Sequence, residues 1–154
     1  MKVTNTGDYA GKQVVQVYME APYNVDPNCG IRGRGLEKSA KVLVGFGKTQ
    51  ILQPGDSETV TIEFKTDDLA SYDNFGYGCY VLEQGDYSFH VSANAHEVIE
   101  TISASVPSSY VYNDSHDGKR DSDLATAVNQ LDDVTAGDGN MLDGYLSRSD
   151  FAAG

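Results

Sequence analysis

Apolar and polar residues alternate along several short stretches in the first part of the chain. A period of two is that of a half-buried β-strand, whose successive side chains point to opposite faces. Two segments show it most clearly, 13–20 (QVVQVYME) and 58–64 (ETVTIEF). The positions expected to face inward are Val15, Val17, Met19, Val60, Ile62 and Phe64.

Three further segments have strand character: 41–46 (KVLVGF), 83–93 (EQGDYSFHVSA) and 97–106 (EVIETISASV). Turn dipeptides separate the strands, with Pro54-Gly55 before 58–64 and Gly85-Asp86 inside 83–93, because proline presets φ and glycine accepts a positive φ. Short strands separated by turns at this spacing are typical of an all-β, antiparallel sandwich, and we expect about six strands.

Two long stretches between the expected strands, 21–40 and 67–80, are rich in Pro, Gly, Asn and aromatic residues, and we expect loops there. A helical turn is expected at the start of 67–80. After Pro107 the composition changes: residues 107–154 hold nine aspartates, no glutamate and three basic residues. Residues 122–134 have weak helical spacing, too short to be stable alone. This tail has the composition of an acidic linker.

The net charge of −12 and the pI near 4.4 argue against nucleic acid and anionic membrane surfaces as partners, because like charges repel. No apolar run approaches the roughly 18 residues of a membrane helix. The N-terminal residues lack the apolar core of a signal peptide, which slightly favours a cytoplasmic over a secreted protein. The chain could also begin inside a longer protein, so the compartment stays open.

The residues with reactive side chains form no recognisable site. Cys29 and Cys79 could form one disulfide, but two free thiols are favoured. No Cys/His cluster suggests zinc, and the aspartates around Gly118 and Gly144 fail the spacing of a calcium loop. The three histidines lack a serine or cysteine partner in a recognisable context. We therefore expect no catalytic residue, no metal and no cofactor.

Four motifs, in order, resemble the fibronectin type III-like domain of glycoside hydrolase family 3 enzymes: VTNTGDYAGKQVVQVYMEAP, LVGFGKTQILQPGDSETVTIEF, DDLASYD and VLEQGDYSFHVSANAHEV. The match spans roughly residues 3–98. The resemblance implies a fibronectin type III-like (immunoglobulin-like) β-sandwich over residues 1–106. It also implies that the strand normally preceding KVTNTG is missing or reduced to Lys2 and Val3. The matching positions are Asn5-Thr6-Gly7, Gly11, Gly45-Phe46, Lys48, Pro54-Gly55, Asp68-Leu69 and Gly85-Asp86-Tyr87.

The tail is similar to the connector in family members whose catalytic barrel follows the fibronectin-like domain. Residues 145–151 (YLSRSDF) resemble the entry into that barrel. Residues 107–154 would then be a linker toward the barrel. Asp150 lies in a Ser-Asp-aromatic motif like that of the family's nucleophile, but no apolar barrel strand precedes it, so we do not expect it to be catalytic.

The resemblance implies a bracing role: the domain would hold the neighbouring α/β sandwich and barrel domains of a β-glucosidase in register, and the chain alone would hydrolyse nothing. The alternative is a carbohydrate-binding module that contacts a β-glucan or oligosaccharide through its tyrosine-rich loops. Arginines of the GIRGRG loop could contact a partner's carboxylates. The candidate contact residues for either role are Tyr23, Arg32, Arg34, Phe46, Tyr72, Phe75, Tyr77 and Tyr80.

Overall fold

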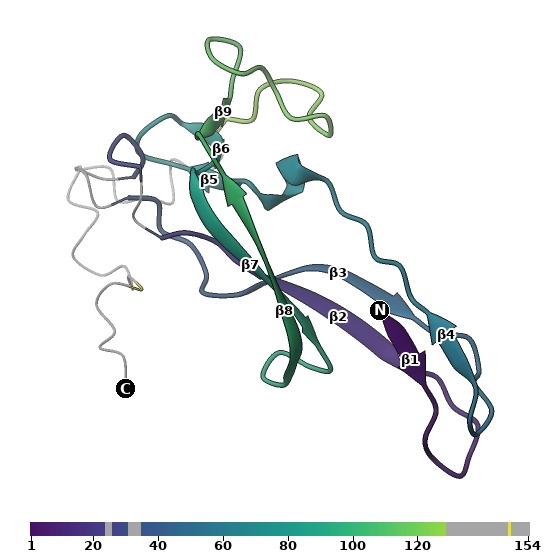
Figure 1. Ribbon diagram of the computed structural model, residues 1–154. Helices are drawn as coiled ribbons and strands as arrows, with labels where there is room; N and C mark the ends of the chain where they lie inside the picture. Colours follow the sequence, from purple (N-terminus) through teal and green to yellow (C-terminus); the bar gives the residue numbers. More distant parts are fainter. Residues whose placement is uncertain (24–25, 31–34, 129–147, 149–154) are drawn as a thin grey trace. The chain divides into compact units, whose positions relative to one another are not determined.

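The computed structural model describes residues 1–23, 26–30, 35–128 and 148 (Figure 1). Within them the regular elements are almost entirely strands, as the alternating pattern predicts. Among these residues, no helix is long and apolar enough to cross a membrane. The elements are β1 (Lys2–Thr4), β2 (Val14–Glu20), β3 (Val42–Lys48), β4 (Ser57–Thr59), the 3₁₀-helix η1 (Thr66–Leu69), β5 (Ser71–Asp73), β6 (Cys79–Leu82), β7 (Gly85–Ser92), β8 (Val98–Val106) and β9 (Tyr110–Tyr112).

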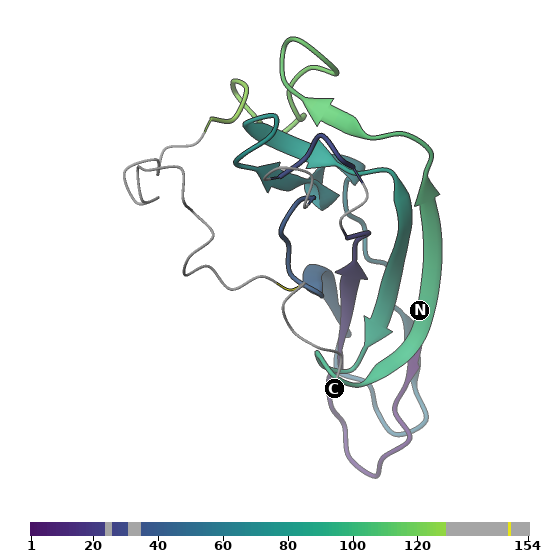
Figure 2. The same cartoon turned by 90° about the vertical axis from the view of Figure 1, so that its left-hand side faces the viewer.

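The chain forms two compact units. The first comprises Met1–Ala21, Lys41–Leu69 and Asp86–Ala104, and the second comprises Pro22–Ala40, Ala70–Gly85 and Ser105–Gly154. The first unit contains an antiparallel sheet with strand order β3-β2-β7-β8 and a two-stranded sheet β1-β4. Figure 2 shows β7 and β8 side by side in the larger sheet.

The burial of alternate side chains along β2 confirms which residues were predicted to face inward. Val15, Val17 and Met19 are buried, while the residues between them are half-buried. On the neighbouring strand β7, Tyr87 and Val91 are buried on the same face. Val15, Val17 and Val91 form the core of the first unit together with Val60 and partly buried neighbours.

The strand expected over 58–64 is shorter than predicted, and this expectation was wrong in its length. β4 covers only Ser57–Thr59, which pair antiparallel with β1, and the amino group of Met1 donates to Val60 O just beyond it at 2.9 Å. The inward positions still hold, since Ile62 and Phe64 pack against the core of the first unit. Burial of the apolar face therefore does not require a complete ladder of hydrogen bonds.

The second unit corrects the expectation of irregular structure in 67–80 and in the start of the tail. β5, β6 and β9 form an antiparallel sheet in that order. The expected helical turn at 67–80 is present as η1, whereas residues 122–128 form no helix and 129–134 lie outside the described residues. A small apolar core underlies this sheet and consists of Cys29, Leu36, Cys79, Val81 and Val111.

Candidate functional site

Two apolar side chains of β3, Leu43 and Phe46, lie on the outer face of the first unit's sheet, where they are 47% and 69% exposed. Phe46 pairs with Gln16 and Leu43 with Tyr18, while Val44 is an extra residue in the ladder. This β-bulge re-aims the strand, so that two residues three apart share one face. We call Leu43 and Phe46 the β3 patch.

The inner face of β3 is closed by contact with the segment after β4. A Cβ added at Gly47 would lie 2.4 Å from a methyl of Val60, and one added at Gly45 would lie 2.6 Å from a methyl of Ile62. Glycine is therefore required at both positions for close approach. The strand that carries Phe46 is packed tightly on one side and bears its large aromatic ring on the other.

The tyrosines of the second long stretch contact one another and a cation, all within the second unit. Tyr72 and Tyr80 face each other across β5 and β6 with ring centroids 5.3 Å apart in an edge-to-face arrangement. The guanidinium of Arg120 lies 3.5 Å above the ring of Tyr80 and donates two hydrogen bonds to Asp123, at 3.0 and 2.8 Å. These bonds hold the pKa of the Asp123 carboxyl below its usual value. One face of Tyr80 is thus occupied by Arg120.

Tyr77 and Phe75 differ in their surroundings. Tyr77 packs against the apolar core of the second unit and lies edge-on to His116 at 5.4 Å, and burial raises the pKa of its hydroxyl. Phe75 is 44% exposed. The remaining candidates are Tyr23, which contacts Glu37, and Arg32 and Arg34, which lie outside the described residues, as does Asp150.

A buried carboxylate organises the turn between β5 and β6. Asp73 is fully buried, and its Oδ1 accepts hydrogen bonds from the backbone N–H groups of Gly30, Phe75 and Gly76 at 3.0, 3.2 and 2.9 Å. Its Oδ2 accepts from Tyr77 N at 2.9 Å. The carboxylate therefore joins the first long stretch to the second.

A buried ion pair is a second contact that holds the first long stretch, residues 21–40, in place. Glu83 is fully buried, and its two oxygens accept hydrogen bonds from Lys38 Nζ and from Asp26 N. The side chain of Lys38 is only 6% exposed. A carboxylate and an ammonium that are both withdrawn from water must remain paired, because an isolated buried charge is very costly.

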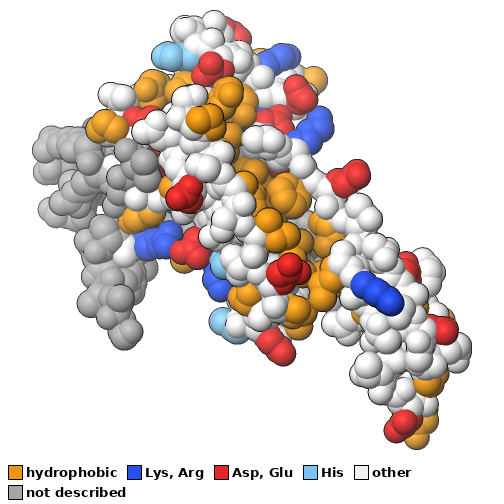
Figure 3. Space-filling view, viewed as in Figure 1, with side chains coloured by type: hydrophobic (Ala, Val, Ile, Leu, Met, Phe, Trp, Pro, Cys, Tyr) orange, Lys and Arg blue, Asp and Glu red, His pale blue; other side chains and the backbone are white. Residues whose placement is uncertain are grey.

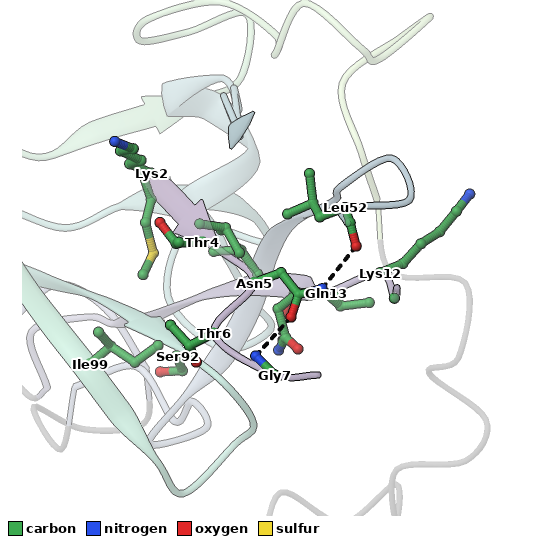
Figure 4. Close-up of a pocket in the computed structure, with 15 residues that line it drawn as sticks. Lys2, Thr4, Asn5, Thr6, Gly7, Lys12, Gln13, Leu52, Ser92 and Ile99 are labelled. Carbon is green, nitrogen blue, oxygen red and sulfur yellow. Dashed lines mark hydrogen bonds between the residues drawn. The ribbon is translucent and has the colours of Figure 1, made fainter. Parts of the chain in front are cut away.

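A cavity near the N-terminus has a volume of about 450 Å³ and belongs to the first unit (Figure 4). Asn5 forms part of its wall, and its amide donates to Leu52 O and Tyr9 O at 2.8 Å each, while its Oδ1 accepts from Gly7 N at 3.0 Å. The Asn-Thr-Gly motif therefore closes a turn. Its amide is used by the backbone and does not point to a ligand.

Potential catalytic and metal-binding groups are sparse in the part of the chain that the structure describes. No group of three or more His, Cys, Asp or Glu residues there could hold a metal ion. His90 lies between Thr101, at 2.9 Å from Nδ1, and Glu20, at 3.4 Å from Nε2. Because these residues come from three adjacent strands of one sheet, we interpret the contacts as cross-strand pairs.

A family model described as the fibronectin type III-like domain matches residues 13–95, more than half of the chain. The chain belongs to the fibronectin type III-like domain family. This confirms the fold class expected from the sequence motifs. The matched range includes β2, β3, β7 and the segments that carry Asp73 and Glu83.

Relatives of this fibronectin type III-like domain are β-glucosidases. A β-glucosidase of Ruminococcus albus is 40% identical over 114 residues, covering 71% of this chain and 11% of that protein. Among solved structures, a β-glucosidase from Paenibacillus barengoltzii has a TM-score of 0.61 and 38% identity, covering 71% of this chain and 12% of that chain. β-Glucosidase 3B of Thermotoga neapolitana, in complex with α-D-glucose, has a TM-score of 0.60 and 31% identity over 72% of this chain and 14% of its own.

The comparisons confirm the resemblance to glycoside hydrolase family 3 β-glucosidases that the motifs predicted. The chain spans about a tenth of the length of these curated relatives, 11% of the β-glucosidase of Ruminococcus albus and 11% of β-glucosidase A of Butyrivibrio fibrisolvens. The fibronectin type III-like domain is therefore a small part of each larger relative.

The residues that organise the second unit were not singled out from the sequence. Asp73 had one available signal, since an aspartate followed closely by glycines is typical of a side chain that bonds to a turn's backbone. Glu83 and Lys38 had no such signal, because they are 45 positions apart, nor did the placement of Arg120 on the distant ring of Tyr80 have one. Both cysteines of the domain are free and buried, as the spacing favoured.

We expect Cys29 to make the stability of the domain fall in alkaline solution. Burial, and then the nearby Asp73 carboxylate, raises the pKa of the Cys29 thiol from 9.0 to about 12. The thiol is thus protonated in the folded state at a pH where it ionises in the unfolded state. The contribution of the protonated thiol to the free energy of unfolding is therefore complete below pH 9. It is lost between pH 9 and about 12, by up to about 1.4 kcal/mol per pH unit.

Urea unfolding at several pH values between 8 and 11 measures this effect. Cys29→Ala removes the ionising group, so its free energy of unfolding should fall less steeply with pH than that of the unchanged chain. Tyr77 and Cys79 titrate in both proteins, and the difference between the two slopes isolates Cys29. Equal slopes would show that the Cys29 thiol does not contribute.

Proposed function

We propose that this chain is a non-catalytic bracing module of a longer family 3 glycoside hydrolase of the β-glucosidase type. In this proposal residues 1–106 form the fibronectin type III-like sandwich, and residues 107–154 lead toward a catalytic barrel that follows. The module would hold the α/β sandwich and barrel domains in register. The proposal is supported by the β-glucosidase relatives, of which the chain spans a small part.

The observation that carries the proposal is the exposed ring of Phe46. It is 69% exposed on a strand whose inner face is closed by contacts of Gly45 and Gly47. A large aromatic residue on a rigid support is typical of the few residues that contribute most to a protein interface. Leu43 extends the apolar surface beside it. We assign the β3 patch to contact with a neighbouring domain of the parent enzyme.

Less supports the carbohydrate-binding alternative. Sugar-binding platforms present an open aromatic face, whereas the ring of Tyr80 is covered by Arg120 and Tyr77 packs against the core. Phe75 remains partly exposed. A soluble β-glucan that binds the chain, with binding lost on Phe75→Ala, would favour this alternative over the bracing role.

Substitution of Phe46 in the full-length protein tests the bracing role. We expect Phe46→Ser to lower kcat/KM for a chromogenic aryl β-glucoside by about tenfold or more, since a small misplacement of catalytic groups can cost up to about a hundredfold. The stability of the 154-residue chain should change little, because Phe46 is exposed there. The same chain should hydrolyse no glucoside by itself.

Ile99→Ser is the matched control, because Ile99 is also a large exposed apolar residue, 55% exposed, on a strand of the same sheet. Figure 3 shows hydrophobic side chains at the surface along β8. The control therefore removes an exposed apolar side chain of comparable kind from a different strand of the sheet. Full activity of Phe46→Ser, or equal losses in both variants, would argue against a bracing role of the β3 patch.

A further inference from the structure

The carboxylate of Glu37 joins two parts of the second unit that lie far apart in the sequence. Its Oε2 accepts a hydrogen bond from the hydroxyl of Tyr23 at 2.8 Å. Its Oε1 accepts a hydrogen bond from the backbone N–H of Arg148 at 2.9 Å, across a separation of 111 positions. The guanidinium carbon of Arg148 lies 4.8 Å from the centre of the Tyr23 ring. We call these three residues the tail latch.

The three contacts support one another chemically. An ionised carboxylate is a stronger hydrogen-bond acceptor than a neutral oxygen. A guanidinium within about 6 Å of an aromatic ring is attracted to the negative face of the ring. Because Glu37 holds the hydroxyl of the same tyrosine whose ring receives Arg148, loss of Glu37 weakens both contacts. Arg148 also lines a surface hollow with Lys38, Ser39 and Ala40.

The base of the tail latch is itself anchored in the second unit. Lys38, next to Glu37, is paired with the buried Glu83. Gly30, in the same stretch of chain, donates its N–H to the buried Asp73. Glu37 is therefore presented from a segment that two buried carboxylates hold in place, although Glu37 itself is exposed.

We propose that Tyr23 and Glu37 form a docking site for the chain's own Arg148, and that this contact fixes the direction in which the chain leaves the domain. The significance of the direction rests on the proposed bracing function, since a fixed exit would help position a domain that follows. The contact does not depend on that function. Its occupant is the tail of the same chain.

Trypsin provides a direct test in the 154-residue chain, because it cleaves after arginine and must bind that side chain and the adjacent backbone. Arg148 cannot bind in the active site of trypsin while its guanidinium lies on the ring of Tyr23 and its backbone N–H is bonded to Glu37. We expect Glu37→Ala and Tyr23→Leu each to increase the initial rate of cleavage after Arg148 by about three- to tenfold, as modest, partly exposed contacts allow. Mass spectrometry of the released residues 149–154 measures this rate.

Matched controls separate the tail latch from a general loss of stability. Glu63→Ala and Tyr9→Leu remove the same side-chain types from exposed positions of the first unit, and neither should accelerate cleavage after Arg148. Cleavage after the exposed Lys12 serves as an internal reference. Unchanged cleavage after Arg148 in both latch variants would overturn the proposal, as would acceleration equal to that at Lys12.

A second variant keeps the test decisive if a substitution in the first long stretch impairs folding. Arg148→Ala changes only the tail partner, and amide NMR shifts should then change at Tyr23 and Glu37 but not at Gly7 in the first unit. No change at Tyr23 and Glu37 would overturn the proposal. The bracing function is tested independently by Phe46→Ser in the full-length protein, so each proposal can fail while the other stands.

Discussion

Replacing Asp73 with alanine should lower the free energy of unfolding by about 3–5 kcal/mol. The carboxylate is fully buried and accepts four backbone hydrogen bonds, from Gly30, Phe75, Gly76 and Tyr77. Hydrogen bonds to a charged group contribute about 1.5–3 kcal/mol each, but the four do not add in full because the turn can relax and admit water. Alanine would leave these N–H groups without their acceptor.

The site has little freedom to rearrange around a missing carboxylate. A Cβ added at Gly76 would lie 2.4 Å from Asp73 Oδ2 and 2.4 Å from the backbone oxygen of Asn28. The backbone is therefore packed directly against the carboxylate and against the first long stretch. For this reason we expect the loss to affect both stretches of the second unit and not only the turn between β5 and β6.

Asp73→Asn should cost less, about 1–3 kcal/mol, since an amide that keeps its oxygen at the Oδ1 position still accepts three of the four bonds. Only Tyr77 N would face an NH₂ group in place of an oxygen. Urea unfolding followed by circular dichroism measures both values, and thiol labelling of the buried Cys29 reports on the second unit specifically. Asp86→Ala, at an exposed position of β7, is the control. An Asp73→Ala midpoint equal to that of the control would contradict the expected role of the carboxylate.

The parts of the fold that the sequence predicted well are those in which one strand buries one face. Val15, Val17 and Met19 face the core because the period of two is local and because all three positions are apolar. The same applies to Tyr87 and Val91. Here a short window of sequence contains all the information that decides which side chains are buried.

The parts that the sequence did not predict depend on contacts between distant segments. The strands β5, β6 and β9 are each only three or four residues long and lie among glycines and polar residues, so their alternation is too brief to recognise. They pair because Asp73 and the apolar core around Val81 hold the surrounding chain. Tertiary contacts overrode weak local signals in this unit.

The candidate contact residues were predicted from a family motif and from loop positions in the sequence, and the structure separates them in a way that the sequence alone cannot. Phe46 and the loop tyrosines were grouped as candidate interdomain or sugar contacts. Leu43 shares the face of Phe46 because of the bulge at Val44, and the covering of Tyr80 follows from Arg120, a residue 40 positions away that the tail supplies. Neither the bulge nor the cation above the ring is indicated by a pattern in the local sequence.

Lys38→Met should lower the free energy of unfolding by about 3–5 kcal/mol, because it removes the counter-ion of a fully buried carboxylate. Glu83 would keep its hydrogen bond from Asp26 N, at 3.0 Å, but would lose the ammonium that balances its charge. The methionine has nearly the length of the lysine, so packing changes little and the loss is due mainly to the uncompensated charge. Lys41→Met, at an exposed position near the start of β3, is the control and should have little effect.

The double variant Lys38→Met/Glu83→Gln distinguishes a lost charge pair from lost packing. Glutamine removes the buried charge while its oxygen still accepts from Asp26 N, so the double variant should be more stable than Lys38→Met alone by at least about 1 kcal/mol. Chemical unfolding of the four proteins of the cycle measures the coupling. If the loss in the double variant, relative to the unchanged chain, equalled the sum of the losses in the two single variants, the two side chains would act independently. The ion pair would then not be what holds the first long stretch in place.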